Sequence, residues 1–234
     1  MLIIANLIQT HYYMRKGIQA ALLIISVIGF YLIYKSIQGP IEFGKESKVR
    51  FAQVIAKLKD IRKCEEAYEA IHKTYTNRFD ELEKFVETGQ FYITTQRDTS
   101  WTEFDKNLRI DVPKQGVVTD TIGKVSVKDS LFKNSDRYKE MSSITIADRT
   151  IPIKIETGVI TRENEVKFPV FEVKVSKKEI LNGLDEDEIN KEVQKTGVND
   201  IKGAYVSVGS MIVASNSGNW PSHYDKSEKK SEGR

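Results

Sequence analysis

From Ile18 to Tyr34 the chain contains no charged residue, and this stretch constrains the fold more than any other. It reads IQAALLIISVIGFYLIY, seventeen residues, with Arg15 and Lys16 before it and Lys35 after it. As a helix it extends ~26 Å, close to the hydrocarbon thickness of a bilayer once the flanking lysines reach toward the headgroups. The sequence therefore predicts a transmembrane anchor at residues 18–34.

Two other interpretations of the stretch exist, a buried core helix and a cleaved secretory signal. A buried core helix is uncommon at this length without a charge in a domain of this size. A cleaved secretory signal needs a small-x-small pair after the apolar region, and residues 35–40 contain no such pair. A retained anchor is the favoured interpretation.

Residues 1–17 form an N-terminal segment ahead of the anchor. Its first thirteen residues are apolar but too short to span, so an interfacial segment is expected if they are translated. Met14 precedes Arg15 and Lys16 as a start codon precedes a basic leader. If translation begins at Met14, mass spectrometry will find no peptide containing Asn6 or His11.

The composition allows one ordinary domain beside the anchor. The chain has 234 residues, with 36 Lys and Arg against 33 Asp and Glu, and the two signs are mixed along it. That balance gives no reason to expect nucleic acid as a partner. Cys64 is the only cysteine, so no intramolecular disulfide is possible.

A helical region is predicted at 45–88, after a break at Gly39-Pro40. A spine helix runs from Lys45 to about Lys73, and a second helix spans Arg78 to Thr88, with Asn77 as its N-cap and Gly89 as its stop. Apolar residues at spacings of three and four mark the inner face of the spine: Phe51, Val54, Ile55, Leu58, Ile61, Tyr68 and Ile71.

A β-rich domain is predicted at 89–215 and a disordered tail at 216–234. Short β-rich runs occur at 91–95, 117–118, 125–127, 144–146, 151–155, 166–175 and 204–213. Pro169 predicts a bulge or an edge strand in the sixth run. The fold class is α+β: a transmembrane helix, then a long amphipathic helix packed on a small, mainly antiparallel β-sheet domain.

The acidic run at 185–188 has two interpretations. Asp185 and Glu188 form an Asp-x-x-Glu cap that opens a helix ending at Gly197. The same run, DEDE, resembles a carboxylate cluster for calcium, but calcium loops place ligands at alternate positions with a glycine between. The helix cap is favoured.

The N-terminal half resembles a known design. An uncharged helix is followed by LKDIRKCEEAYEAIHKTYTNRFDELEKFV (Leu58 to Val86) and then by the expected sheet. Residues 14–95 resemble type IV pilins and the pseudopilins of type II secretion, in which a helical spine precedes a Tyr-Thr turn and an Asp-Glu-Leu helix. Lys16-Gly17 stands where a prepilin peptidase would cut, while Leu22 stands where pilins usually place a glutamate.

The second half resembles an uncharacterised single-pass membrane-protein family of the Bacteroidota. The residues that carry this resemblance are VSVKDSLF (125–132), KFPVFEVKV (167–175), LNGLD (181–185) and NSGNW (216–220). The resemblance implies a bacterial envelope setting and no activity.

No catalytic, cofactor-binding or metal-binding residues are predicted. His11, His72 and His223 lie in separate regions, and Cys64 is interpreted as a small, partly buried residue and not as a nucleophile. Gly123-Lys124 lacks the rest of a phosphate loop. Two groups of residues could form binding surfaces, but packing in the core or at a sheet edge and a solvated helix face are the favoured roles: aromatic residues (Trp101, Phe104, Trp220) and a basic helix face that could contact anionic lipid (Lys57, Lys59, Arg62, Lys63, Lys73).

The expected function is a non-enzymatic, membrane-anchored structural or interaction component of a bacterial envelope assembly, pilin- or pseudopilin-like. The alternative is an anchored extracytoplasmic domain that binds a solute or polymer in an aromatic-lined pocket between helix and sheet. The expected partners are the lipid bilayer through residues 18–34 and other proteins or further copies. Lys and Arg near the membrane mildly favour a cytoplasmic domain. Signal anchors begin as this chain does, however, so we expect the bacterial inner membrane with the C-terminal domain in the periplasm.

Overall fold

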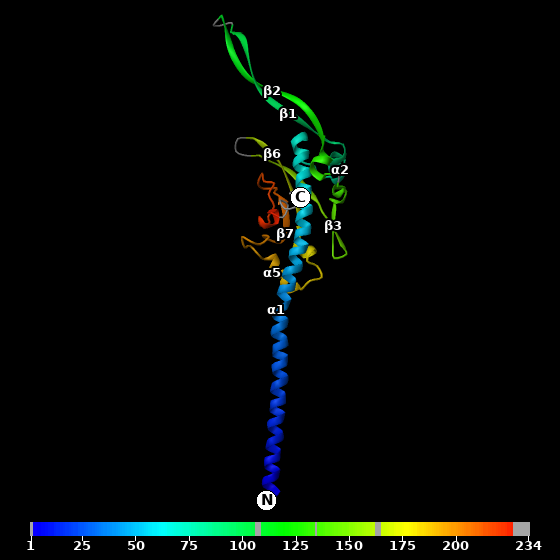
Figure 1. Cartoon of the computed structure of the whole chain (residues 1–234), viewed down its shortest axis with the longest axis vertical. Helices are drawn as coiled ribbons and strands as arrows, with labels where there is room; N and C mark the ends of the chain where they lie inside the picture. The colour runs from blue at the N-terminus through cyan, green and yellow to red at the C-terminus, as the bar shows by residue number, and fades with distance from the viewer. Residues whose placement is uncertain (1, 106–108, 134, 162–164, 227–234) are drawn as a thin grey trace.

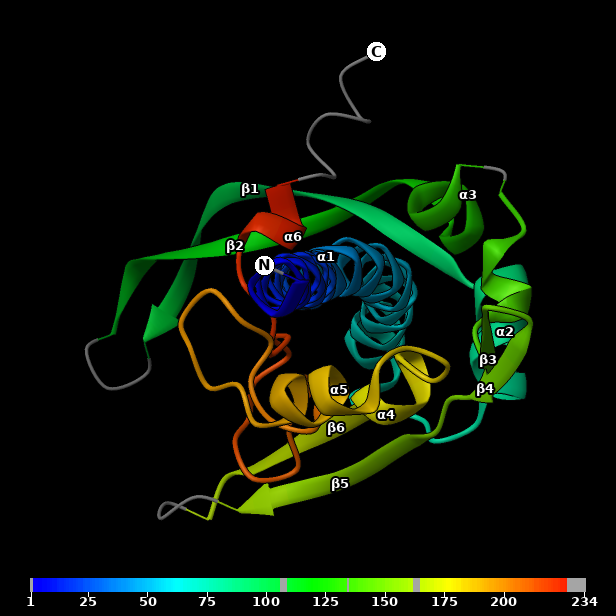
Figure 2. The ribbon, with the colours of Figure 1, turned by 90° about the horizontal axis from the view of Figure 1, so that it is seen from below.

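The computed structural model describes residues 2–105, 109–133, 135–161 and 165–226. Its main feature is α1 (Leu2–His72), a single helix of 71 residues that extends far below the rest of the chain (Figure 1). The other elements surround only the C-terminal part of α1. Seen along the helix, they lie on several sides of it, with α4 and α5 on one side and α6 on another (Figure 2).

The predicted break at Gly39-Pro40 is wrong, because α1 continues through Pro40. A proline removes one hydrogen bond from the helical ladder and crowds the carbonyl four residues earlier. The turns on both sides keep their own hydrogen bonds, which is sufficient to hold the helix together here. The predicted N-terminal segment, anchor and spine thus form one helix.

α1 ends where Lys73 adopts a positive φ of 62°. The Lys73 N–H donates to the Glu69 carbonyl at 2.7 Å. The second helix, α2 (Phe79–Thr88), follows a short turn, and its N-cap position is Arg78, not the predicted Asn77. Thr76 organises this turn instead, since its Oγ1 accepts from the Arg78 N–H at 3.3 Å and donates to Glu81 at 2.8 Å.

A long antiparallel ribbon comes next, formed by β1 (Gln90–Asp105) and β2 (Ile110–Ser126). Three of the predicted short runs belong to it, and the third ends at Ser126 because Val127 begins α3 (Val127–Phe132). A register shift between Ile93 and Thr94 leaves Ile122 without a cross-strand partner.

The second sheet is a small hairpin of β3 (Ser143–Ile146) and β4 (Arg149–Pro152), preceded by the 3-10 helix η1 (Arg137–Glu140). Ala147 and Asp148 connect the strands with φ of 46° and 63°. Positive φ at both central residues is typical of the tight turn that matches strand twist.

The third sheet has the order β5-β6-β7, with antiparallel pairs throughout. Its strands are β5 (Ile155–Thr161), β6 (Lys167–Ser176) and β7 (Tyr205–Gly209). β7 pairs only with Glu172–Ser176, so Pro169 lies where β6 has a single neighbour, as predicted for an edge position. No register shift occurs at Pro169.

Two short helices follow β6: α4 (Lys177–Ile180) and α5 (Glu186–Val193). Asp185 caps α5, accepting from the N–H groups of Asp187 and Glu188 at 3.0 and 3.1 Å. The predicted cap is confirmed, but α5 ends at Val193 and not at Gly197.

The fold class is confirmed at the level of an α+β chain with a long apolar N-terminal helix and small antiparallel sheets. One continuous core joins α1 to the other elements. Its fully buried members on α1 include Val54, Leu58 and Ile61, and they belong to the same cluster as Phe171 of β6 and Val208 of β7. Ile71 is exposed, so the predicted inner face is one turn too long.

The predicted disorder from Asn216 onward is wrong for residues 216–226. Asn216 and the Tyr75 hydroxyl are hydrogen-bonded, and the Asn219 side chain accepts from the Ser207 N–H and donates to the Tyr205 carbonyl. Trp220 is buried, and α6 (His223–Lys226) follows it. These polar contacts need no apolar period, which is why the sequence pattern did not indicate them. Residues 227–234 lie outside the described residues.

Candidate functional site

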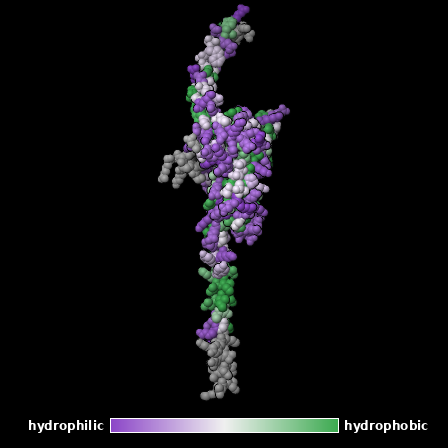
Figure 3. Space-filling view, turned by 90° about the vertical axis from the view of Figure 1, so that its right-hand side faces the viewer, coloured by the Kyte–Doolittle hydropathy of each residue, from purple (hydrophilic) through white to green (hydrophobic). Residues whose placement is uncertain are grey.

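The first candidate surface is the apolar part of α1. Its large side chains from Ile18 to Ile37 are all more than half exposed, and Phe30 reaches 73%. They form a hydrophobic band below the polar body of the protein (Figure 3). Because no other part of the described chain covers this band, the interpretation as a buried core helix is wrong.

By length and composition, α1 is the one helix in the described chain that is long and apolar enough to cross a membrane. A signal sequence has the same properties. The structure therefore establishes a long, exposed, apolar N-terminal helix that is compatible with a transmembrane or signal anchor.

The second feature is a set of buried charged groups that attach the domain to α1. Arg50 donates from Nη1 to the carbonyls of Ile180 and Asn182 at 3.2 and 2.9 Å, and from Nε to Glu46 at 2.9 Å. The carbonyls lie at the end of α4, where a cation satisfies acceptors that the helix leaves free. Arg50 thereby connects α1 to α4.

Lys59 makes a second connection, to the C-terminal segment. It is 2% exposed, donates to the Tyr224 carbonyl at 2.7 Å and lies 3.2 Å from an oxygen of Asp225. Burial alone would raise the pKa of Asp225, but the hydrogen bond from Trp220 and the contact with Lys59 lower it overall. Lys57 similarly donates to the carbonyls of Glu140 and Ser143.

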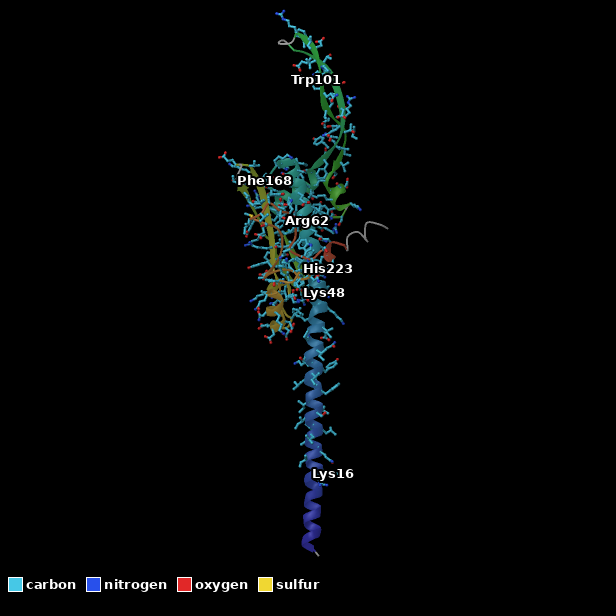
Figure 4. The ribbon with its side chains drawn as sticks, turned by 90° about the vertical axis from the view of Figure 1, so that its left-hand side faces the viewer. Lys16, Lys48, Arg62, Trp101, Phe168 and His223 are labelled. Atoms are coloured by element: carbon cyan, nitrogen blue, oxygen red, sulfur yellow. The ribbon has the colours of Figure 1, made fainter. Side chains whose placement is uncertain are left out.

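These contacts correct the interpretation of the basic helix face. Lys57 and Lys59 are used inside the fold, so they form neither a lipid-facing surface nor a solvated helix face. Arg62 lies within the body (Figure 4) and, like Lys63, is half-buried, whereas Lys73 is exposed just after the end of α1.

A buried ion pair lies between α4 and α5. Lys177 is fully buried; its Nζ donates to the carbonyls of Glu192 and Ile201 at 2.9 and 2.6 Å and lies 3.4 Å from the Glu192 carboxylate. Burial lowers the pKa of Lys177, and the neighbouring Glu192 opposes that change. This lysine holds α4, α5 and the segment before β7 together.

Glu65 is a buried carboxyl on α1 with one oxygen left over. Its Oε2 accepts from the Thr76 N–H at 3.2 Å, while Oε1 has no hydrogen-bond partner. Burial raises the pKa of Glu65 to about 8, and the Thr76 hydrogen bond opposes the rise. The neighbouring Cys64 is also buried, with a pKa raised by burial and then by Asp60 and Glu65, which disfavours the reactive thiolate.

A groove of about 280 Å³ lies beside α1 just above its apolar part. Its apolar wall includes Phe43, Phe51 and Tyr224. The charged groups at its rim largely pair with each other: Lys191 with Glu188 and Lys195 with Glu192, both at 2.6 Å. His223 and Lys48 also line it (Figure 4).

The remaining candidate residues do not come together. Trp101 and Phe104 are exposed on β1, whereas Trp220 belongs to the core. His72 stacks on Tyr68 with ring centroids 4.2 Å apart, and His223 lines the groove. Asp185 serves as the cap of α5, and among the described residues no three His, Cys, Asp or Glu side chains form a metal-binding group.

The sequence reasoning missed two features. Arg50, Lys59, Glu65 and Lys177 are buried, and the sequence did not indicate this because a charged residue gives no local sign of burial. The β1–β2 ribbon was also missed, although 90–105 and 110–126 contain no Ala, Leu or Met and are rich in β-branched and aromatic residues. Nothing matches the chain in comparisons with protein-family models, curated proteins and solved structures.

Proposed function

We propose that the protein is a single-pass membrane protein and a non-enzymatic structural or interaction component of a bacterial envelope assembly, pilin- or pseudopilin-like. One observation carries the proposal: the exposed apolar part of α1 runs without interruption into the core of the folded domain. In such a helix, the position of the anchor determines the position of the domain.

The spacing along α1 supports a membrane-proximal domain. The apolar stretch ends at Tyr34 and the core begins at Phe43, which corresponds to ~13 Å of helix at 1.5 Å per residue. The body would therefore lie directly beside the headgroup layer. With no flexible linker between anchor and domain, its orientation relative to the bilayer is fixed.

The resemblance to pilins and pseudopilins is consistent with this arrangement. In residues 14–95 it implies a helical spine followed by a second helix and an antiparallel sheet, and α1, α2 and the sheets follow in that order. The buried charged residues of α1 bind other parts of the same chain, so they serve assembly of the fold and not a reaction.

Membrane fractionation tests the anchor. The full chain should remain in the membrane pellet after alkaline carbonate washing, and a chain lacking residues 1–40 should be soluble, because it retains the core from Phe43 onward. Protease added to intact spheroplasts should cut the domain if it is periplasmic.

The assembly role needs a separate measurement. In mild detergent and after in-cell crosslinking, the full chain should run as complexes larger than one copy. A protein that is carbonate-resistant but runs as a monomer with no crosslinked partner would contradict the assembly role and leave the anchor intact.

The groove beside α1 favours a second candidate, an anchored solute- or polymer-binding domain. Its aromatic lining at Phe43, Phe51 and Tyr224 suits an apolar or ring-containing ligand. Phe43→Ser should then abolish retention of such a ligand by the full chain, whereas Val49→Ser, an exposed change on the same helix, should not. Equal retention by both variants would contradict this second function.

A further inference from the structure

The β1–β2 ribbon projects away from the body, at the end of the molecule opposite the N-terminus (Figures 1 and 4). β1 has 16 residues, which corresponds to roughly 50 Å of strand. Within the described chain, this sheet contains no third strand, so the outer edges of both strands are open. Isolated two-stranded ribbons are marginally stable in water, and open edges are templates for another strand.

The ribbon also exposes large apolar side chains. Ile122 is 68% exposed and Trp101 48%, and the others are Tyr92, Ile93, Phe104, Ile110, Val117, Val118 and Val125. Trp101 lies near the distal end of the ribbon, far from the apolar part of α1 (Figure 4). The bilayer that holds the anchor therefore cannot cover these side chains, whereas another protein surface could.

The charges of the ribbon indicate which surface fits. Arg97 of β1 lies 3.2 Å from Asp120 of β2, and Lys114 of β2 pairs with Glu103 of β1. To these two pairs each strand contributes one cation and one anion, in positions that complement the other strand. The outer edge of β1 is complementary to the outer edge of any β2, including that of another copy.

We propose that the ribbon pairs edge to edge with the ribbon of a second copy, β1 of one beside β2 of the next. This inference rests on the proposed function, since anchored copies share one membrane and point in the same direction. With that shared direction, β1 and a neighbouring β2 are antiparallel. Two neighbouring β1 strands would be parallel and would place Arg97 beside Arg97 and Glu103 beside Glu103, a repulsive arrangement.

The pairing segment on β2 is bounded on both sides. Pro113 lacks an N–H to donate, and the irregularity at Ile122 disturbs the ladder at the other end. Between them, Lys114 to Thr121 is uninterrupted strand and contains Lys114 and Asp120, the two residues of β2 that form the cross-strand ion pairs. Lateral repetition in register would give rows in which Arg97 alternates with Asp120 and Glu103 with Lys114.

Such a contact joins two different edges, so each copy retains one free edge after pairing. Contacts of this kind build rings or open rows instead of closed dimers. Pairing through the ribbon therefore predicts complexes larger than two.

Cysteine crosslinking in membranes tests the pairing. Gln96 and Thr119 are directly opposite each other across the ribbon and both are exposed. Gln96→Cys in one full-length copy and Thr119→Cys in a second, differently tagged copy should give a disulfide-linked mixed dimer after mild oxidation. Neither variant alone should give more dimer than the parent, whose Cys64 is buried.

Each other result overturns the inference. Dimers from Gln96→Cys alone would indicate pairing of two β1 edges, and a crosslink to a different protein would assign the ribbon another partner. If mixed dimers are missing while lysine crosslinking still shows larger complexes, only the ribbon pairing fails. If the chain is a monomer by both methods, the assembly role fails as well.

A charge exchange tests the register. Arg97→Asp combined with Asp120→Arg keeps the pairing within a chain and between two exchanged copies. When only the copy with Thr119→Cys carries the exchange, Arg97 of the other copy lies beside the arginine introduced by Asp120→Arg, and the two cations repel. The yield of mixed dimer should then fall about two- to five-fold, the range expected for a surface cross-strand pair. Exchange in both copies should restore it, and equal yields in all three mixtures would contradict the inference.

Discussion

The carboxylate of Glu65 and the backbone N–H of Thr76 are joined by a buried hydrogen bond of 3.2 Å, which attaches the last turns of α1 to the turn that precedes α2. Only one carboxylate oxygen takes part, and the other is buried without a partner. A buried carboxylate with one unsatisfied oxygen is costly in its charged form. Burial accordingly raises the pKa of Glu65 to about 8.

Stability should therefore fall as the pH rises from about 5 to about 8. The pKa of Glu65 is about 8 in the folded chain against 4.5 for an ordinary glutamate. The stabilisation that Glu65 contributes is complete below about pH 4.5 and is lost progressively as the pH approaches about 8. It amounts to a few kcal/mol, at about 1.4 kcal/mol per pKa unit. Denaturant unfolding of the chain lacking residues 1–40, between pH 5 and 9, measures the slope.

Glu65→Gln should flatten this slope and make the protein more stable than the parent at pH 9. The exposed neighbour gives the control, since Glu66→Gln should leave the slope unchanged. A parent and a Glu65→Gln protein with the same pH dependence would show that Glu65 is not the titrating group.

The buried pair of Lys177 and Glu192 leads to a second prediction. Lys177→Met removes the cation while keeping the length of the side chain, so the Glu192 carboxylate and two carbonyls lose a donor. Removing one partner of a buried pair typically costs about 3–5 kcal/mol. Lys191→Met, at an exposed position on α5, should change the free energy of unfolding by less than about 0.5 kcal/mol. Similar losses in both variants would exclude a special role for Lys177.

Features that depend on neighbouring residues could be predicted from the sequence, whereas features that depend on distant residues could not. Apolar periodicity acts locally, so the inner face of α1 from Phe51 to Ile61 and the cap at Asp185 could be predicted. Strand partners are chosen by distant residues, and the sequence therefore showed the runs at 91–95 and 117–118 without showing that they form one ribbon. Proline at position 40 has a strong local preference against helix interiors, but the turns on both sides outweigh it.

The same reasoning explains the candidate site. The exposed apolar stretch could be predicted because a continuous run needs no knowledge of the fold. Burial of Lys59 and Lys177 depends on carbonyls more than 20 residues away along the chain, at Tyr224 and Ile201, and no local pattern encodes those acceptors.

A third prediction concerns Gly116 in the ribbon. The Trp101 ring covers this glycine so closely that an added Cβ would lie 2.7 Å from the ring. Gly116→Val should displace the indole and raise the quenching of Trp fluorescence by acrylamide, while Trp220 remains protected in the core. Gly123→Val is the matched control on β2, because its Cβ would meet only Ile93 at 4.0 Å. Unchanged quenching in Gly116→Val would place the Trp101 ring elsewhere.

The last prediction concerns the attachment of α1 to the domain. Leu58 and Ile61 are fully buried in the common core, and truncating such residues typically costs 2–5 kcal/mol. From sequence alone, Lys59→Ala would be expected to leave stability unchanged, but Lys59 is almost fully buried and donates to Tyr224. Leu58→Ala, Ile61→Ala and Lys59→Ala should therefore all lower the melting temperature of the chain lacking residues 1–40 by several degrees, and Lys45→Ala, at an exposed position, should not.

In addition, Lys59→Ala should expose the C-terminal segment to carboxypeptidase, since it releases α6 without opening the core. If Leu58→Ala and Ile61→Ala melt like the parent, α1 is not part of the domain core; if Lys59→Ala alone does so, the C-terminal segment is held by Trp220 and Asn219 without the lysine.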